Sequence, residues 1–189
     1  MGTRPDLLAS TLRSAHARAI EGFASRLSQV NDGDWSLPTP CTEWDVQALV
    51  NHVVGANVRY EMILRAVSLE EVEATRTVDH LGDAPLESFK TTAGAVVRAF
   101  APPDVLDRTF RHVTGERTGR QLLVMRTYDI GVHTWDLAVA IGGDRQIDHA
   151  VVEAALTATV PAAAETDSCS AQERLLVRSG RRPNKEEHR

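Results

Sequence analysis

The sequence has few of the residues that define several common protein classes. It contains only two cysteines, Cys41 and Cys169, which excludes a disulfide scaffold and a zinc site made of thiolates alone. No apolar run approaches the roughly 20 residues that a membrane-spanning helix needs. The first eight residues include Asp6 and lack the apolar stretch of a secretory signal. We therefore expect a cytoplasmic protein without a membrane partner.

Positive charge is also scarce. Lys and Arg number 21 against 26 Asp and Glu, so the formal net charge is −5. A general nucleic-acid binder needs a basic surface, and this class is excluded. Apolar residues still make up 42% of the 189 residues, enough for the core of one domain. The chain has seven histidines, and imidazole is the commonest metal ligand, so their positions need explaining.

Four long segments carry apolar residues at three- and four-residue steps, which predicts four helices, at residues 3–30, 42–67, 83–100 and 119–141. Thr3, Thr42 and Asp83 are the expected N-terminal caps. The stripe of the first helix runs from Leu8 to Val30. We expect a polar loop with a helical turn at residues 69–74, and an extended stretch at 109–113.

Shorter elements follow the fourth helix. Asp148 is the expected cap of a helix that ends at Pro161, and Ser170 with Glu173 forms a capping-box pattern at the start of a last helix. The charged segment from residue 181 to 189 is expected to fray. Because no strand series is visible, the fold class is all-α, a bundle at residues 1–164 with a short helix and tail at 165–189.

Two helices carry residues suited to metal binding. Asp129 and His133 are four residues apart, so their side chains share one helix face. His52 interrupts an apolar stretch of the second helix, which can face the fourth helix in an antiparallel bundle. Together they would form a site of two histidines and one carboxylate, which fits iron(II) as well as zinc. The alternatives are a solvated Asp–His ion pair and a hydrogen-bonded core histidine.

Longer stretches around these residues resemble a known family. Residues 38–46 (PTPCTEWDV) and 49–55 (LVNHVVG) resemble the N-terminal signature of the mycothiol-dependent maleylpyruvate isomerases, within the DinB/YfiT-like superfamily. Residues 129–140 resemble the second signature of the same family. Residues 172–176 are similar to its C-terminal end. The resemblance covers nearly the whole chain.

This resemblance implies a DinB-like four-helix bundle with short extra C-terminal helices and a divalent metal, commonly zinc, in an open cavity. The family's ligands fall on His52, Asp129 and His133, with Asp129 standing where the isomerase has Glu. We expect these 189 residues to be too few for the isomerase's additional C-terminal domain as well. We therefore do not expect the isomerase reaction itself to carry over.

The resemblance also implies a function. A low-molecular-weight thiol such as mycothiol is the expected cosubstrate, and a small electrophile is the expected second substrate, for S-transfer or a thiol-assisted isomerisation. Nickel, iron and manganese are alternatives to zinc. The competing class is a non-enzymatic metal-binding or small-molecule-binding protein. The sequence leaves both a monomer and a homodimer open.

Several further residues are candidates near the site. Arg126 and Asp136 lie three residues on either side of the ligand pair, and Asp136 is expected to orient His133, with a surface ion pair as the alternative. His112 is a candidate extra ligand or base. An arginine group is a candidate anion receptor, with a solvated loop face as the alternative: Arg108, Arg111, Arg117, Arg120 and Arg126.

The remaining candidates have simpler interpretations. Cys41 is interpreted as part of the turn that enters the second helix, and His16 as an edge of the cavity. The tryptophans are expected in the core or along the cavity, and three histidines at the surface: Trp35, Trp44 and Trp135; His80, His149 and His188.

Overall fold

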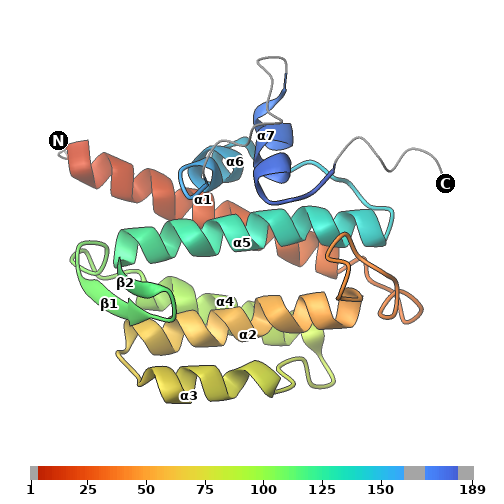
Figure 1. Cartoon of the computed structure of the whole chain (residues 1–189), viewed down its shortest axis with the longest axis horizontal. Coiled ribbons are helices and arrows are strands. Elements are labelled where there is room, and N and C mark those ends of the chain that lie inside the picture. Colours follow the sequence, from red (N-terminus) through yellow and green to blue (C-terminus); the bar gives the residue numbers. More distant parts are fainter. Residues whose placement is uncertain (1–3, 160–168, 183–189) are drawn as a thin grey trace.

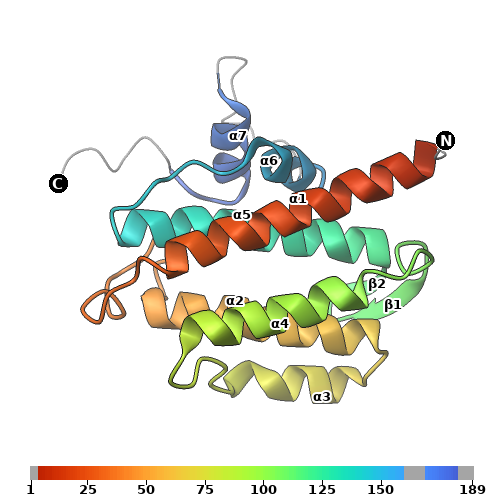
Figure 2. The same cartoon turned by 180° about the vertical axis from the view of Figure 1, so that it is seen from behind.

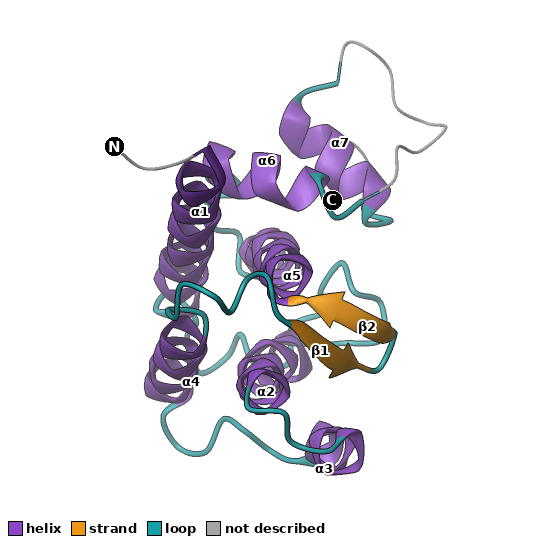
Figure 3. Cartoon of the chain, turned by 90° about the vertical axis from the view of Figure 1, so that its left-hand side faces the viewer, coloured by secondary structure: helices purple, strands orange, loops and turns teal. Residues whose placement is uncertain are grey.

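The computed structural model describes residues 4–159 and 169–182, with side chains from Leu8 onward in the first helix. Four long helices form a bundle, α1 (Arg4–Leu27), α2 (Val46–Leu64), α4 (Pro85–Ala99) and α5 (Gly119–Ala140) (Figure 1). Seen end-on, α1 and α4 form one layer and α5 and α2 the other (Figure 3). The predicted all-α class with a four-helix bundle is confirmed.

The chain directions follow from the order of the elements. α1 and α5 run the same way, and α2 and α4 run the opposite way (Figures 1 and 2). α2 and α4 are parallel because the chain returns between them through α3 (Leu69–Ala74) and a 3-10 turn, η1 (Thr75–Thr77). α2 and α5 are therefore antiparallel neighbours, as the metal-site interpretation requires.

Smaller elements cover the bundle. A hairpin of β1 (Thr109–His112) and β2 (Gly115–Thr118) precedes α5, with Phe110 opposite Arg117 in the register. α6 (His149–Leu156) and α7 (Ala171–Arg178) lie over α5 on the side away from α2 (Figure 3). α7 begins at the expected capping box, and its Leu175 and Leu176 are buried in a core cluster shared with the bundle.

Some predicted helix ends are wrong. α2 begins at Val46 and is capped by Asp45, whose carboxylate accepts a hydrogen bond from the Ala48 amide at 2.8 Å, not by Thr42. The preceding residues are held outside the helix because Pro38 and Asp45 form a β-bridge. α4 has Ala84, not Asp83, at its N-cap, without a side-chain hydrogen bond.

The first helix also differs from its prediction. α1 ends at Leu27, and Leu8, which the apolar stripe placed inward, is 60% exposed. The helix predicted to end at Pro161 is also too long, because α6 ends at Leu156. Thr3, Pro161 itself, His188 and the proposed boundary between residues 164 and 165 lie outside the described residues. None of the helices in the described part of the chain is long and apolar enough to cross a membrane.

The interior of the bundle has two apolar clusters with a polar layer between them along the helices. One cluster contains Phe23 and Val53, and the other contains Tyr60 and Leu123. Polar side chains from all four bundle helices occupy the layer between them, the buried His16, Asn57, Arg126 and Thr127 and the half-buried Thr92. A buried polar group must find a partner to offset its lost hydration, so this layer is where the bundle can hold a functional site.

Candidate metal centre

The local fold brings the entry of α2 and the middle of α5 together. Thr39 fixes the segment before α2, because its hydroxyl donates to the Trp44 carbonyl at 2.8 Å. The indole of Trp44 then lies on the ring of His52, with centroids 4.6 Å apart. α5 is started by a capping box of Thr118 and Gln121 and runs unbroken through the site residues.

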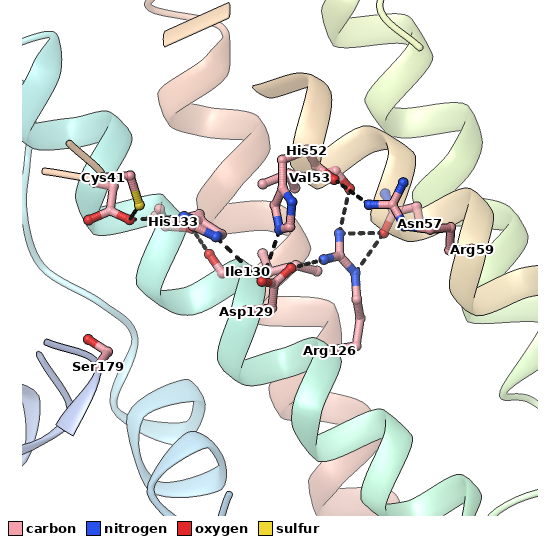
Figure 4. Close-up of polar contacts among 12 residues, drawn as sticks. Cys41, His52, Val53, Asn57, Arg59, Arg126, Asp129, Ile130, His133 and Ser179 are labelled. Atoms are coloured by element: carbon pink, nitrogen blue, oxygen red, sulfur yellow. Dashed lines mark hydrogen bonds and ion pairs between the residues drawn. The ribbon is translucent and has the colours of Figure 1, made fainter. Parts of the chain in front are cut away.

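Two of the predicted ligands, His52 and His133, converge on one carboxylate oxygen of the third, Asp129. Nε2 of His52 lies 3.2 Å from Oδ1 of Asp129, and Nε2 of His133 lies 3.4 Å from the same oxygen. Figure 4 shows the two imidazoles turned toward Asp129 from α2 and α5. The side chains of His52 and Asp129 are each 25% exposed, whereas that of His133 is 9% exposed. The trio is therefore closed on the His133 side and accessible at His52 and Asp129.

The second oxygen of Asp129 is bound by Arg126, a fully buried arginine. Arg126 is held in turn by α2, since its Nε and Nη2 donate to Oδ1 of Asn57 at 3.0 and 2.7 Å. Nη2 also donates to the carbonyl of Val53 at 2.7 Å. These contacts fix the carboxylate of Asp129 with Oδ1 toward the two histidines, and they place Arg126 beside the trio rather than on a loop face.

The second nitrogen of His133 is bound by Asp136, the contact that the three-residue spacing predicted. Nδ1 lies 2.9 Å from Oδ2 of Asp136, whose side chain is fully buried. Arg181, beyond α7, donates from Nε to Oδ1 of Asp136 at 3.1 Å and from Nη2 to Oδ2 at 2.5 Å. The same Nη2 lies 2.9 Å from Sγ of Cys41. Arg181 is thus ordered, contrary to the expected fraying of the tail from this residue.

The charges of the trio are strongly coupled. Burial raises the pKa of Asp129, but the hydrogen bonds from His133 and His52 outweigh it and hold that pKa well below its usual range. Burial lowers the pKa of His133, but the hydrogen bonds to Asp129 and Asp136 outweigh it and raise that pKa well above its usual range. For His52, burial prevails and lowers the pKa. Without an ion, His133 is therefore an imidazolium between two carboxylates.

The donor set fits a divalent metal. Two imidazole nitrogens and one carboxylate oxygen lie within 4.8 Å of one another. Ligands placed tetrahedrally at about 2.1 Å from an ion are about 3.4 Å apart, close to the two spacings around Oδ1 of Asp129. A carboxylate on the far nitrogen of a ligating histidine is also the usual support of such a site. The same spacings suit hydrogen bonds, so the geometry fits both the ion-bound and the ion-free trio.

A second trio, Cys41, His133 and Asp136, is equally compact. It differs because the guanidinium of Arg181 contacts both Cys41 and Asp136. A cation of the protein therefore already occupies the position that an ion would take. This leaves His52, Asp129 and His133 as the better candidate.

A cavity of about 350 Å3 adjoins the site. His52 and Asp129 form part of its wall, and His112 of β1 lines it too, with its Nδ1 2.9 Å from Oγ1 of Thr114. His112 thus lies on the cavity wall, and its Nδ1 is hydrogen-bonded to Thr114. A small molecule in this cavity would meet two of the three candidate ligands directly.

Other expectations about single residues were wrong. His16 does not line this cavity but lies buried beside Thr127, with its Nε2 lacking a partner. His80 is half-buried, and its Nε2 lies 2.9 Å from the carbonyl of Thr75. His149 is exposed, as expected. The arginine group splits, since Arg126 is interior, whereas Arg108 and Arg111 are exposed and Arg117 and Arg120 are half-buried.

Three contributors were not identified from the sequence. Asn57 supports Arg126, Arg59 lines the cavity, and Arg181 anchors Asp136. For Asn57 and Arg59 a signal existed, because both are polar residues at inward positions of an apolar helix. Arg181 gave none, since it acts 45 residues away from its partner.

Comparison with known proteins adds three findings. A sequence model of the mycothiol maleylpyruvate isomerase N-terminal domain matches residues 16–138, which include all three candidate ligands. Two uncharacterized Mycobacterium tuberculosis proteins, MT0763 of strain CDC 1551 and Rv0738 of strain H37Rv, are each 34% identical over 134 residues, covering 71% of this chain and 69% of theirs. The family model covers more than half of this chain, and the relatives are covered over more than two thirds of their length, so these matches are long enough to assign the chain to a family.

Solved structures agree at the level of the fold. The crystal structure of the mycothiol-dependent maleylpyruvate isomerase superposes with a TM-score of 0.62 at 17% identity, covering 82% of this chain and 70% of the isomerase chain. A histidine-to-alanine variant of that isomerase gives a TM-score of 0.63 at 16% identity with the same coverage. Identity this low supports a shared fold and carries no residue role with it.

Proposed function

The chain belongs to the family of the mycothiol maleylpyruvate isomerase N-terminal domain, and from this premise we propose that it is a metal-dependent enzyme that uses a small thiol such as mycothiol. The observation that carries the proposal is the convergence of His52 and His133 on Oδ1 of Asp129 at the wall of a cavity. Two histidines and one carboxylate leave a divalent ion with at least one position for a thiol or water.

In this proposal the ligands are His52, Asp129 and His133, with zinc as the first choice and nickel, iron or manganese as alternatives. Such an ion lowers the pKa of a thiol bound to it and so supplies a thiolate near neutral pH. Asp136 accepts a hydrogen bond from Nδ1–H of His133, which keeps the proton on Nδ1 and leaves Nε2 available as a ligand. Arg126 holds Asp129 by its second oxygen, so that Oδ1 points to the histidines.

The cavity offers space for both substrates. A neighbouring cavity of about 350 Å3, lined by Arg117 and Arg120, shares Met125 and Ala158 with the first. The pair suits a thiol with a long polar body, whose sulfur reaches the trio while a small electrophile lies beside His52. S-transfer or a thiol-assisted isomerisation is the reaction class that this arrangement favours. The cytoplasmic location and the choice between monomer and homodimer stay predictions.

The first experiment is elemental analysis of protein purified without added metal. We expect about one divalent ion per chain in the wild type, and its loss in His52→Ala and in His133→Ala. His149→Ala is the matched control, because the side chain of His149 is 83% exposed and lies away from the trio. A wild type that stays free of metal after incubation with zinc, nickel or manganese would contradict the proposal.

The second experiment tests whether a thiol coordinates the ion, as the proposed reaction requires. Cobalt(II) substituted for the natural ion reports its ligands through its visible spectrum, which changes strongly when a thiolate coordinates. We expect mycothiol to alter the spectrum of the cobalt protein. An unchanged spectrum, with metal still bound, would favour the non-enzymatic alternative, in which the protein closes the coordination shell.

A further inference from the structure

The bundle contains two buried arginines near the trio, and their guanidinium groups are bound very differently. Arg126 donates to Asn57, Asp129 and the carbonyl of Val53. Arg59, only 8% exposed, has one acceptor among the described residues, the carbonyl of His52, at the long distance of 3.5 Å from its Nη2. A guanidinium carries five N–H donors. Most donors of Arg59 therefore have no acceptor in the described protein.

The unbound donors of Arg59 face the cavity. Arg59 lines this cavity together with His52 and Asp129. Among the described residues, the one buried polar side-chain atom that is sealed off without a partner belongs to His16, so the donors of Arg59 are open to the cavity. A cation buried in this way needs an anion or water to offset its lost hydration.

The local backbone makes room for this arrangement. A Cβ atom on Gly55 would lie 2.9 Å from Nη1 of Arg59 and 2.6 Å from Cδ2 of His80. Because residue 55 is glycine, the guanidinium can lie against its own helix, one turn from its Cα atom and close to the His52 carbonyl. Arg59 is thus held beside the trio by packing, while its donors stay available.

The other charges of the cavity wall single out Arg59. Arg76 is paired with Glu73, with Nε 2.6 Å from the carboxylate, so this cation is already neutralised. Arg126 is not part of the cavity wall, and it is neutralised by Asp129. One unpaired guanidinium matches one carboxylate in charge and in its two-point geometry.

We propose that Arg59 binds a carboxylate of the substrate and thereby selects acidic small molecules. The proposal rests on the proposed function in one respect only, that the cavity beside the trio is the substrate site. It assigns the recognition of the second substrate to α2, the same helix that supplies His52. Because Arg59 and His52 line the same cavity, one small molecule can contact both Arg59 and the candidate ion.

The test is a calorimetric titration with succinate as the probe, run on metal-free and on zinc-treated protein. We expect succinate to bind the wild type, and its neutral diamide, succinamide, not to bind. Arg59→Gln should weaken succinate binding by about tenfold to a hundredfold, the usual effect of losing a charged hydrogen-bond donor. Arg59→Lys keeps the charge but not the two-point geometry, so its succinate affinity should lie between those of the wild type and Arg59→Gln.

The control is Arg65→Gln, because Arg65 lies just beyond the end of the same helix with its side chain 68% exposed; it should bind succinate like the wild type. Equal succinate affinity in Arg59→Gln and the wild type would overturn the proposal, as would a wild type that binds no succinate or prefers phosphate. If Arg59→Gln loses its helical circular dichroism, Arg59→Lys carries the same test.

Metal content, measured on the same samples, separates this proposal from the function on which it rests. We expect Arg59→Gln to hold as much zinc as the wild type, because Arg59 contacts His52 only through its backbone carbonyl. A protein that binds succinate through Arg59 but takes up no metal would refute the metal-dependent function and leave the role of Arg59 standing.

Discussion

Arg181 donates hydrogen bonds to both carboxylate oxygens of Asp136, although the two residues are 45 positions apart in the chain. Asp136 in turn binds Nδ1 of His133 at 2.9 Å. The end of the described chain is therefore joined to the candidate metal ligand through one buried carboxylate. The hydrogen bonds from His133 and Arg181 outweigh burial and lower the pKa of Asp136, so this carboxylate is ionised.

Replacing Arg181 should therefore weaken both the fold and the metal site. In Arg181→Gln the fully buried Asp136 keeps only His133 as a charged partner. We expect the free energy of unfolding to fall by about 2 to 3 kcal/mol, since a buried charge that loses its partner is costly. Zinc affinity should fall about tenfold through the loosened His133. Denaturant unfolding and zinc titration measure the two effects.

Arg182→Gln is the control for this change, because Arg182 is the exposed neighbour of Arg181. It should leave stability and zinc affinity within experimental error of the wild type. An Arg181→Gln variant as stable as the wild type would show that Asp136 is adequately held by His133 alone.

The sequence predicts the candidate site well where one helix alone determines the geometry. Asp129 and His133 share a face of α5 because they are four residues apart, and the same spacing logic brings Arg126 and Asp136 to it. His52 could be paired with them because the family signature surrounds it and because α2 and α5 are adjacent.

Contacts between distant segments could not be predicted in this way. Nothing near Arg181 in the sequence marks Asp136 as its partner, and a charged C-terminal segment is more often solvated. The start of α2 was misplaced for a related reason. Thr42 and Asp45 are both good caps, and the choice is made by the bridge between Pro38 and Asp45, a contact outside the helix itself.

The pH dependence of stability should depend on His16. Burial, followed by the charge of Arg126, lowers the pKa of His16 to about 3. Between the ordinary pKa of 6.5 and about 3 the unfolded chain binds a proton there and the folded chain does not. The free energy of unfolding therefore falls as the pH decreases through this range, with a slope of about 1.4 kcal/mol per pH unit from this residue.

His16→Leu removes this contribution, so the difference in stability between the variant and the wild type should change with pH in the same range. Denaturant unfolding at a series of pH values measures it. His149→Gln, at an exposed position, should parallel the wild type. Parallel curves for His16→Leu and the wild type would show that His16 is not buried as a neutral ring.

Metal binding should release a proton from the trio. Burial lowers the pKa of His133, but the hydrogen bonds that His133 makes to Asp129 and Asp136 outweigh burial and raise this pKa well above 6.5. An ion needs the neutral imidazole, so apparent affinity should rise about tenfold per pH unit below that raised pKa and level off above it. Zinc titration in buffers of different ionisation enthalpy counts the protons released. A pH-independent affinity would mean that His133 is not a ligand.

The packing of α5 against α6 can be tested at Gly131, where the gain in helix propensity from alanine opposes the cost of overpacking. Gly131 lies inside α5, where alanine would gain about 0.5 to 1 kcal/mol in helix propensity. A Cβ atom there would lie 2.8 Å from Cγ1 of the buried Val151, and overpacking costs about 1 to 3 kcal/mol. We expect the clash to prevail, so that Gly131→Ala is destabilised by about 1 kcal/mol.

Two further variants separate the opposing effects on Gly131. Gly94→Ala, inside α4, meets only the flexible end of Arg98 at 3.3 Å and should gain stability. Val151→Ala alone should lose about 2 kcal/mol by leaving a cavity, but in combination with Gly131→Ala the total loss should be smaller than the sum, because the new methyl group fills that space. Denaturant unfolding of the four proteins in this cycle gives the coupling. Additive losses would mean that Gly131 and Val151 do not form the close contact between α5 and α6.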